Sequence, residues 1–318
     1  PNECLQQGKA DAVIKAIWEA KAYHPANIVN GSELWDVLSK KEDITSYPLP
    51  WLDLPLSSMT EGLRKGELVT VTAGTGIGKT TFVRQLAYHL GVKCYAKVGL
   101  LMLEENVKRT ANGLIGLHLG KPSRNLVVDD KYRKAFDDIM DKYVFYEHFG
   151  SLESDDLLQA IRFMVTGQQV DFIILDHISI AISGLDITDE RKATDVLMTR
   201  LRSLVEETGV GMIVVSHLRR TEGTPAEEGG ALSLSHLRGS QAISQLSDSV
   251  WGLERNQQDN GKKKNLIRVR VLKNRFSGET GIAGHLQYDK DTDRLETITD
   301  LTEFETTPFD GKEDKGDF

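Results

Sequence analysis

The sequence predicts an α/β domain with a mostly parallel central sheet and antiparallel strands added at its C-terminal side. Apolar, β-rich segments recur along the chain, and helical patterns at 80–90 and 154–167 separate the early ones. Such alternation of unbroken apolar strands with helices is typical of a parallel sheet covered on both faces. The last segments follow one another with little helix between them, which predicts antiparallel pairing. The β-rich segments are 67–73, 97–104, 144–149, 170–177, 211–218, 249–255, 265–274 and 285–289.

Composition and charge are those of an ordinary globular enzyme. The chain has 318 residues, of which 40% are hydrophobic and 27% are charged, enough for one large domain with attachments or for two small domains. Cys4 and Cys94 lie far apart and have no metal-ligand spacing, so we expect a reducing, intracellular setting. No apolar run is long enough to cross a bilayer, and we expect no membrane partner. The net charge of −8 argues against a surface broadly adapted to nucleic acid, so any DNA contact would be local and channel-like.

A leader of about 55 residues precedes the α/β domain. It contains a helical pattern at 10–23 and a second, short helix expected at about Ser32–Ser39. Ser32 would cap this helix, and Trp35 and Leu38 would contribute an apolar face. A short amphipathic helix needs a surface to pack on, which is either the chain's own core or a neighbouring subunit.

The two ends of the chain have their own character. The first residue is Pro1 rather than Met and no signal-peptide pattern is present, so we expect a fragment or a processed chain. The tail beyond about Thr297 is acidic, lacks apolar periodicity and ends in Phe318, which predicts disorder.

A glycine-rich segment between the strand at 67–73 and the helix at 80–90 matches the phosphate-binding pattern G-x-x-x-x-G-K-[ST], with alanine in the first position. Backbone N–H groups of such a loop converge on phosphates, and the helix dipole favours an anion at the same place. We expect Lys79 to reach the outer phosphates of a nucleoside triphosphate (NTP) and the Thr80 hydroxyl to bind Mg²⁺. A plain glycine-rich turn is the alternative, and the strand–loop–helix order argues against it. The loop comprises Ala73, Gly74, Thr75, Gly76, Ile77, Gly78, Lys79 and Thr80, followed by Thr81.

Carboxylates follow two other predicted strands. Asp176 ends an apolar run, where a partner for Mg²⁺ belongs beside the phosphate loop; a helix cap is the alternative. Glu104 and Glu105 come at the end of another strand, and hydrolysis needs a base or water-orienting group near the outermost phosphate. Because neighbouring strand residues face opposite sides, we expect one of the two to be catalytic and the other to supply charge at a helix N-terminus.

Three further polar residues lie at strand ends. His217 ends the strand at 211–218, within expected reach of the phosphates, although a lone histidine is often structural. Lys273 and Arg275 occupy alternate positions at the end of the strand at 265–274 and therefore point the same way. They are either protective charges on an edge strand or cations that reach a nucleotide held by a neighbouring subunit.

Several segments together resemble a known family. The chain is similar to the RecA-like helicase domain, with its linker, of the bifunctional primase-helicases of phage T-seven type, and more distantly to mitochondrial Twinkle and the bacterial DnaB-type helicases. The resemblance runs from about residue 60 to the C-terminus, and the opening PNECLQQG resembles the end of a primase part. It is carried by AGTGIGKTTFVRQLA, GLLMLEEN, IILDHISI, SHL, LRGSQAISQLSDSVWGLERNQQ and LKNRFSGETG.

The resemblance implies boundaries and roles. It implies that Glu104 is the catalytic carboxylate, that His217 senses the γ-phosphate, and that Arg275, assisted by Lys273, completes the next subunit's site in trans. It also implies that Arg255 and Tyr288 sandwich the base of the nucleotide, ATP or dTTP, which is sensible for a guanidinium and a ring. The implied parts are 1–28 for the end of the primase part and linker, 29–55 for a linker helix on a neighbouring subunit, 56–297 for the RecA-like helicase domain and 298–318 for the tail.

The implied function is that of a replicative DNA helicase. In the family a hexameric ring, with a heptamer as the alternative here, threads single-stranded DNA with 5′ to 3′ polarity, so a net-acidic subunit still binds DNA through a few concentrated cations. The resemblance also implies a replicative DNA polymerase bound at the acidic tail, for which a merely solubilising tail is the alternative. It further implies a primase domain in the intact protein, and the host cytoplasm (for a phage protein) or mitochondrial matrix (for a Twinkle-type protein) as location. The implied DNA-contacting residues are Arg219, Arg220, Arg238, Gly239 and Ser240.

One departure from the family concerns the first DNA loop. The phage relative's loop is richer in lysine, whereas this loop becomes acidic at Glu227 and Glu228. A RecA-type recombinase or a regulatory ATPase is the alternative function, and a non-enzymatic, ATP-gated loading module is a third. The LRGS, LERNQQ and LKNRF segments argue against the first two, and the presence of Glu104 and Asp176 argues against the third.

Overall fold

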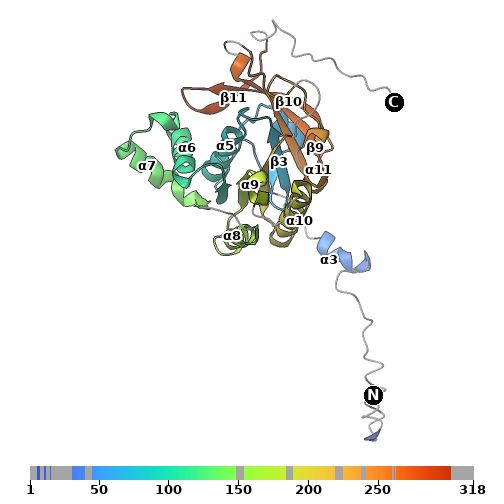
Figure 1. Ribbon diagram of the computed structural model, residues 1–318. Coiled ribbons are helices and arrows are strands. Elements are labelled where there is room, and N and C mark those ends of the chain that lie inside the picture. The colour runs from blue at the N-terminus through green and yellow to red at the C-terminus, as the bar shows by residue number, and fades with distance from the viewer. Residues whose placement is uncertain are drawn as a thin grey trace, which may run out of the picture. The chain divides into compact units, whose positions relative to one another are not determined.

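The computed structural model divides the chain into two units, Pro1–Ile44 and Thr45–Phe318. It describes residues 31–39, 45–147, 154–183, 189–218, 225–237, 241–259, 261 and 263–301, together with the single positions 6, 7, 11 and 15 (Figure 1). The predicted disorder of the tail and most of the predicted helical pattern at 10–23 lie outside these residues.

The N-terminal unit contains the expected short helix in a different form. A 3₁₀ turn, η1 (Gly31–Leu34), leads into a single α-helical turn, α3 (Trp35–Leu38). The cap position of α3 is therefore Leu34 and not Ser32 as predicted, because the 3₁₀ turn occupies the residues before it. Trp35 and Leu38 are 72% and 74% exposed, which leaves the predicted apolar face open to solvent in the single chain.

A nine-stranded sheet forms the centre of the second unit and confirms the predicted fold class. The strand order is β11-β10-β9-β8-β3-β7-β6-β4-β5, with parallel pairing from β8 to β5 and antiparallel pairing from β8 to β11. The strands are β3 (Leu68–Ala73), β4 (Val98–Met102), β5 (Tyr143–Phe145), β6 (Phe172–Asp176), β7 (Gly211–His217), β8 (Ser249–Glu254), β9 (Leu266–Asn274), β10 (Gly281–Asp289) and β11 (Arg294–Ile298). A separate two-stranded ribbon joins β1 (Ser46–Tyr47) to β2 (Leu63–Arg64).

Helices cover both faces of this sheet (Figure 1). The α-helices of the unit are α4 (Pro55–Thr60), α5 (Lys79–Val92), α6 (Val107–Leu119), α7 (Asp130–Ile139), α8 (Ser154–Thr166), α9 (Ile178–Ser183), α10 (Glu190–Thr208) and α11 (Gln241–Leu246). Short 3₁₀ turns are η2 (Ser123–Asn125), η3 (Met140–Lys142), η4 (Leu234–His236) and η5 (Lys263–Asn265). No helix in the described part of the chain combines the length and apolar character that a membrane crossing requires.

The two faces of the sheet bury two separate apolar cores. Along β6, Phe172 and Ile174 belong to the core that includes α5, while Ile173 and Leu175 belong to the core that includes α8 and α10. Alternate strand residues point to opposite faces, so a strand buried on both sides is apolar throughout. This explains why the sequence shows unbroken apolar runs rather than alternation.

The second unit begins earlier than residue 56. Leu49, Trp51 and Leu54 are almost fully buried in the core that includes α5. The Trp51 ring stacks on Phe82 at a centroid distance of 4.5 Å, and its Nε1 donates a hydrogen bond to the carbonyl of Leu295 at 2.8 Å. The segment from Thr45 onward is therefore part of the α/β domain rather than of the leader.

The parallel strands bring their C-terminal ends to one edge of the sheet. Ala73 at the end of β3 pairs directly with His217 at the end of β7, and Met102 of β4 pairs with Asp176 of β6. Residues that are distant in the chain thereby meet at this edge, which we call the phosphate-loop edge.

Candidate active site

The phosphate loop connects β3 to α5 as the sequence predicts. It runs from Ala73 through Gly78, and Gly76 and Gly78 have φ values of +71° and +115°, which favour glycine. Lys79 starts α5 and is buried. Its Nζ donates hydrogen bonds to the carbonyls of Ala73 and Gly74, each at 3.0 Å. The lysine is thus held against the loop that would receive the phosphates.

Burial and neighbouring carboxylates act on the charge of Lys79 in opposite directions. Burial lowers the pKa of Lys79, while the charges of Asp176, Glu104 and Glu227 raise it in that order. A phosphate bound beside this ammonium would add a further negative charge and would likewise favour its protonated form.

Thr80 and Asp176 form the second part of the site. The Thr80 Oγ1 donates a hydrogen bond to Asp176 Oδ2 at 2.7 Å. The other oxygen, Oδ1, is buried and accepts no hydrogen bond from any residue that the structure describes. Burial raises the pKa of Asp176, and the Thr80 hydrogen bond opposes this. A hydroxyl and a carboxylate with a free buried oxygen are donors that suit Mg²⁺ and its waters, so these residues fit the predicted metal.

Glu104 lies beside two histidines at the same edge. His177 Nε2 and Glu104 Oε1 are 2.7 Å apart, His217 Nε2 is 3.9 Å from the same oxygen, and the two histidine rings are 4.1 Å apart at their centroids. His217 Nδ1 lies 3.2 Å from Lys79 Nζ. His217 therefore lies in space between the other two predicted residues, Glu104 and Lys79.

Glu105 points elsewhere. Its carboxylate accepts hydrogen bonds from Arg84 at 2.7 Å and from the Thr110 hydroxyl at 2.9 Å, and it pairs with Arg109 at the start of α6. The divergence of Glu104 and Glu105 arises in the turn that follows β4, not in the strand itself. Of the two, Glu104 is the one that faces Lys79 and His217.

Arg255 and Tyr288 lie near each other next to the phosphate-loop edge. Arg255 follows Glu254, which pairs with Arg268, and Tyr288 follows Gln287, which pairs with Leu266. Both partners lie at the start of β9. The Arg255 Nε donates to the carbonyl of Lys264 at 2.5 Å, and the Tyr288 hydroxyl donates to Asp293 at 2.6 Å. Burial, followed by the bond to Asp293, raises the pKa of Tyr288 to about 12, so the ring is neutral at physiological pH.

Lys273 and Arg275 lie at the opposite edge of the sheet, where the parallel strands begin. Asn274 at the end of β9 pairs with Ser249 at the start of β8, which in turn pairs with Val69 near the start of β3. Lys273 Nζ donates to the carbonyls of Ser244, Gln245 and Ser247, at 2.6, 3.2 and 2.6 Å. Arg275 contacts Asp248 at 3.1 Å and the carbonyl of Gln245 at 2.6 Å. Neither cation is part of the phosphate site of its own chain.

The residues predicted to contact DNA lie outside the described residues. Arg219, Arg220, Arg238, Gly239 and Ser240 all fall within 219–224 or 238–240. The described segment between these two stretches runs from Pro225 to Leu237, and Leu237 pairs with Leu218.

Sequence reasoning missed several side chains at or near the site. His177 directly follows Asp176 and carries no separate sequence signal. Glu227 and Gln257 contact Thr75 of the phosphate loop from distant parts of the chain. Glu254 is fully buried and pairs with Arg268 and Arg270. The one local signal for these is a charged residue at the end of an apolar run, as in WGLE for Glu254.

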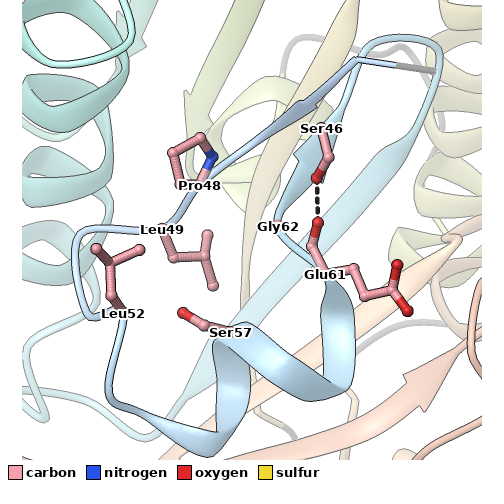
Figure 2. A pocket seen from close by; sticks show the side chains of 7 residues that line it. All are labelled: Ser46, Pro48, Leu49, Leu52, Ser57, Glu61 and Gly62. Atoms are coloured by element: carbon pink, nitrogen blue, oxygen red, sulfur yellow. Dashed lines mark hydrogen bonds between the residues drawn. The ribbon is translucent and has the colours of Figure 1, made fainter. Parts of the chain in front are cut away.

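A pocket of about 280 Å³ lies apart from this site (Figure 2). It is lined by Ser46, Pro48, Leu49, Leu52, Ser57, Glu61 and Gly62, and the Ser46 hydroxyl bonds the Glu61 carbonyl. The neighbouring Tyr47 packs on Phe172, the first residue of β6, with 4.8 Å between ring centroids. The pocket therefore belongs to the edge opposite the phosphate loop.

Comparison with known families agrees with this geometry. Residues 53–297 match the family described as "DnaB-like helicase C terminal domain". The chain belongs to this family. It is 40% identical over 309 residues to the DNA helicase/primase of Enterobacteria phage T3, covering 93% of this chain and 54% of that protein. It is 23% identical over 265 residues to the replicative DNA helicase DnaC of Bacillus subtilis, covering 79% of this chain and 57% of that protein.

The chain thus spans about half the length of these DnaB-like relatives. The resemblance predicted from the sequence motifs is confirmed.

Solved structures confirm the RecA-like fold of the DnaB-like domain. A structure described as an ATPase domain superimposes with a TM-score of 0.65 at 19% identity, covering 92% of this chain and 99% of that one. A DnaB-like replicative helicase studied for its interactions with primase gives 0.66 at 19%, covering 93% and 73%. A KaiC-like protein from Pyrococcus horikoshii gives 0.56 at 18%, covering 80% and 98%. At these identities the likeness concerns the fold alone.

Proposed function

We propose that this chain is the motor part of a replicative DNA helicase, in which NTP hydrolysis between subunits drives movement along single-stranded DNA. One observation carries the proposal. A chain of the DnaB-like helicase family has its phosphate-binding and carboxylate residues at one edge of the sheet and Arg275 at the other. A second subunit is needed to bring the two edges together.

The chemistry at the phosphate-loop edge suits NTP hydrolysis. Lys79 and the backbone of residues 73–81 would hold the phosphates, and Thr80 and Asp176 would hold Mg²⁺. Bound Mg²⁺ would neutralise charge on the outer phosphates. Glu104 takes the proton from the water that attacks the terminal phosphorus, and the nucleoside diphosphate leaves. His177 is in hydrogen-bond contact with Glu104, and His217 lies between Glu104 and Lys79, where it senses the terminal phosphate.

The subunit interface completes the site. Arg275, assisted by Lys273, reaches the phosphates of the neighbouring subunit and stabilises the charge that develops in the transition state. A head-to-tail contact of this kind generates a ring when the rotation closes, so we propose a hexamer or heptamer. Arg255 and Tyr288 enclose the base of ATP or dTTP.

The other proposed partners rest on the family and on the phage T3 relative. Arg219, Arg220, Arg238, Gly239 and Ser240 would contact single-stranded DNA in the ring, with 5′ to 3′ movement. The acidic tail at 298–318 would bind a replicative DNA polymerase, and a primase domain would precede the leader in the intact protein. The exposed Trp35 and Leu38 of α3 would pack on the next subunit. The host cytoplasm is the corresponding location.

Unwinding of a forked duplex with a 5′ single-stranded tail tests the proposal. We expect NTP-dependent strand separation, strong stimulation of NTP hydrolysis by long single-stranded DNA, and loss of both in Lys79→Ala. Lys65→Ala is the matched control, because Lys65 is an exposed lysine paired with Asp171 away from the phosphate loop. A rate of NTP hydrolysis that does not depend on DNA, together with no unwinding at any NTP concentration, would favour a regulatory ATPase instead.

A further inference from the structure

Glu227 lies against the phosphate loop although it belongs to the acidic segment that follows the predicted DNA loop. Its Oε1 accepts a hydrogen bond from the backbone N–H of Thr75 at 2.9 Å. A Cβ placed on Gly74 would come within 2.5 Å of the same oxygen, so the carboxylate lies directly on the loop backbone. Of the two acidic residues noted in the sequence, Glu227 therefore faces the candidate nucleotide site.

Gln257 holds the same loop residue from the other side. Its Nε2 donates to the Thr75 carbonyl at 2.8 Å, and its backbone N–H donates to the Glu227 carbonyl at 2.8 Å. The peptide groups of Thr75 are thus held by two residues that are also bonded to each other. We call Glu227, Gln257 and Thr75 the loop clamp.

The loop clamp is part of a well-defined segment. Glu228 pairs with Asn256 in an antiparallel bridge, and the N–H of Leu232 donates to the buried carboxylate of Glu254 at 2.8 Å. The N–H groups of Glu228 and Gly230 both donate to the Pro225 carbonyl, at 2.9 and 3.1 Å, which makes a tight turn. Segment 225–230 is therefore fixed to the end of β8 and, through Glu227, to the phosphate loop.

The charge of Glu227 conflicts with that of a triphosphate. Among the residues that the structure describes, the carboxylate is bonded to a backbone N–H and forms no ion pair with a lysine or arginine. It lies close enough to Lys79 to raise the pKa of that lysine. A carboxylate oxygen and a phosphate oxygen are both anionic acceptors, so they compete for the N–H groups and the ammonium of this loop.

We propose that Glu227 is a latch on the phosphate loop, which the terminal phosphate of a bound NTP displaces, thereby releasing segment 225–230. This inference rests on the proposed function, because it assigns a role to a residue of the same nucleotide site. Glu227 acts through Thr75 and is a positioning residue rather than a catalytic one. Because the clamp joins the phosphate loop to a segment directly after residues 219–224, the state of the nucleotide is transmitted toward the loop proposed to contact DNA.

Nucleotide binding without DNA tests the latch. The probes are a non-hydrolysable NTP analogue and the corresponding nucleoside diphosphate, each with Mg²⁺, titrated against the full chain. Glu227→Gln keeps an oxygen that accepts from Thr75 and removes the charge, while Glu227→Ala removes both. Glu228→Gln is the matched control, since it makes the same charge change one residue away on an exposed side chain.

We expect Glu227→Gln to bind the triphosphate analogue tighter by about threefold to tenfold, the size of removing one charge from a partly solvated site. Glu227→Ala should gain at least as much, the diphosphate should gain less, and Glu228→Gln should stay within about twofold of the wild type. Unchanged or weaker analogue binding in both Glu227 variants would overturn the latch, as would an equal gain for the diphosphate or for Glu228→Gln.

Amide hydrogen exchange gives a second readout, because a clamp with a purely structural role would show no change in exchange when nucleotide binds. In the wild type the triphosphate analogue should raise amide exchange in 225–230 and at Gln257, and in Glu227→Ala this exchange should be high without nucleotide. Exchange in 225–230 that falls on binding would contradict the latch. If the wild type binds the triphosphate analogue and the Glu227 variants bind it with the same affinity, the latch alone is refuted. If the wild type binds no triphosphate analogue, the proposed function is refuted as well.

Discussion

The position of Arg275 makes the most demanding prediction. The register places Asn274 beside Ser249 and Val69, whereas the phosphate loop starts at Ala73, about 13 Å further along β3 at 3.3 Å per residue. The Arg275 guanidinium is moreover bound to Asp248 and to the carbonyl of Gln245, on the side away from the loop. If Arg275 acts in hydrolysis, it acts on another subunit's nucleotide.

Two inactive variants should therefore restore each other's activity. We expect Arg275→Ala to lower NTP hydrolysis by about 10³-fold, near 4 kcal/mol of transition-state stabilisation, while nucleotide binding is kept. Lys79→Ala should be inactive because it lacks the phosphate contact. In randomly mixed rings of these two, about one site in four combines an intact Lys79 with an intact Arg275 from the next subunit. DNA-free hydrolysis should recover to about a quarter of the wild-type rate if sites fire independently.

A double variant distinguishes an arginine that acts between subunits from one that acts within its own subunit. Wild type mixed equally with Lys79→Ala/Arg275→Ala should give about a quarter of the wild-type rate when the arginine acts between subunits, and about half when it acts within one. Arg133→Ala is the control, because Arg133 is an exposed arginine paired with Asp137. Half the rate in the double-variant mixture, with no recovery between the two single variants, would refute the reasoning from the register.

Three further predictions concern Asp176, Trp51 and Tyr288. Burial raises the pKa of Asp176, so its ionised form costs stability above that pKa and the cost fades as pH falls and the native carboxyl takes up a proton. Asp176→Asn should abolish hydrolysis yet raise the free energy of unfolding at pH 8, and this gain should shrink as the pH falls through the pKa of Asp176, measured by denaturant titration; a loss of stability at pH 8 would contradict this. Trp51→Ala should lower the free energy of unfolding by about 3–5 kcal/mol. Leu52→Ala, a change at a side chain that is 68% exposed, should stay within about 0.5 kcal/mol, and equal effects of the two would argue that residues 45–55 lie outside the domain. Tyr288→Ala should weaken NTP binding about tenfold without changing the binding of inorganic triphosphate, and Tyr288→Phe should keep NTP binding because the ring remains; equal losses in both would exclude base stacking.

Local patterns were sufficient for much of the fold. The phosphate loop is a contiguous motif between a strand and a helix, and its position from Ala73 to Lys79 could be read directly. The apolar runs at β3, β4, β6 and β7 could be read because both faces of those strands are buried. The strand β11 was missed, since RLETI alternates weakly and depends on β10 for its pairing. The segment around Trp51 was assigned to the leader because its burial depends on Phe82 and Leu295, far away in the sequence.

The sequence by itself determined that this protein has an α/β domain of the DnaB-like helicase family with a phosphate-loop motif, and which residues stand at its strand ends. These features are local, because a loop motif and an apolar run carry their own chemistry wherever they occur in the chain. Tertiary structure alone decided how those residues meet. The strand order put Glu104, Asp176 and His217 beside Lys79, the antiparallel register put Arg275 at the far edge, and a long-range contact put Glu227 on the phosphate loop. Sheet order, register and such contacts join residues tens to hundreds of positions apart, and no local pattern specifies which partners will meet.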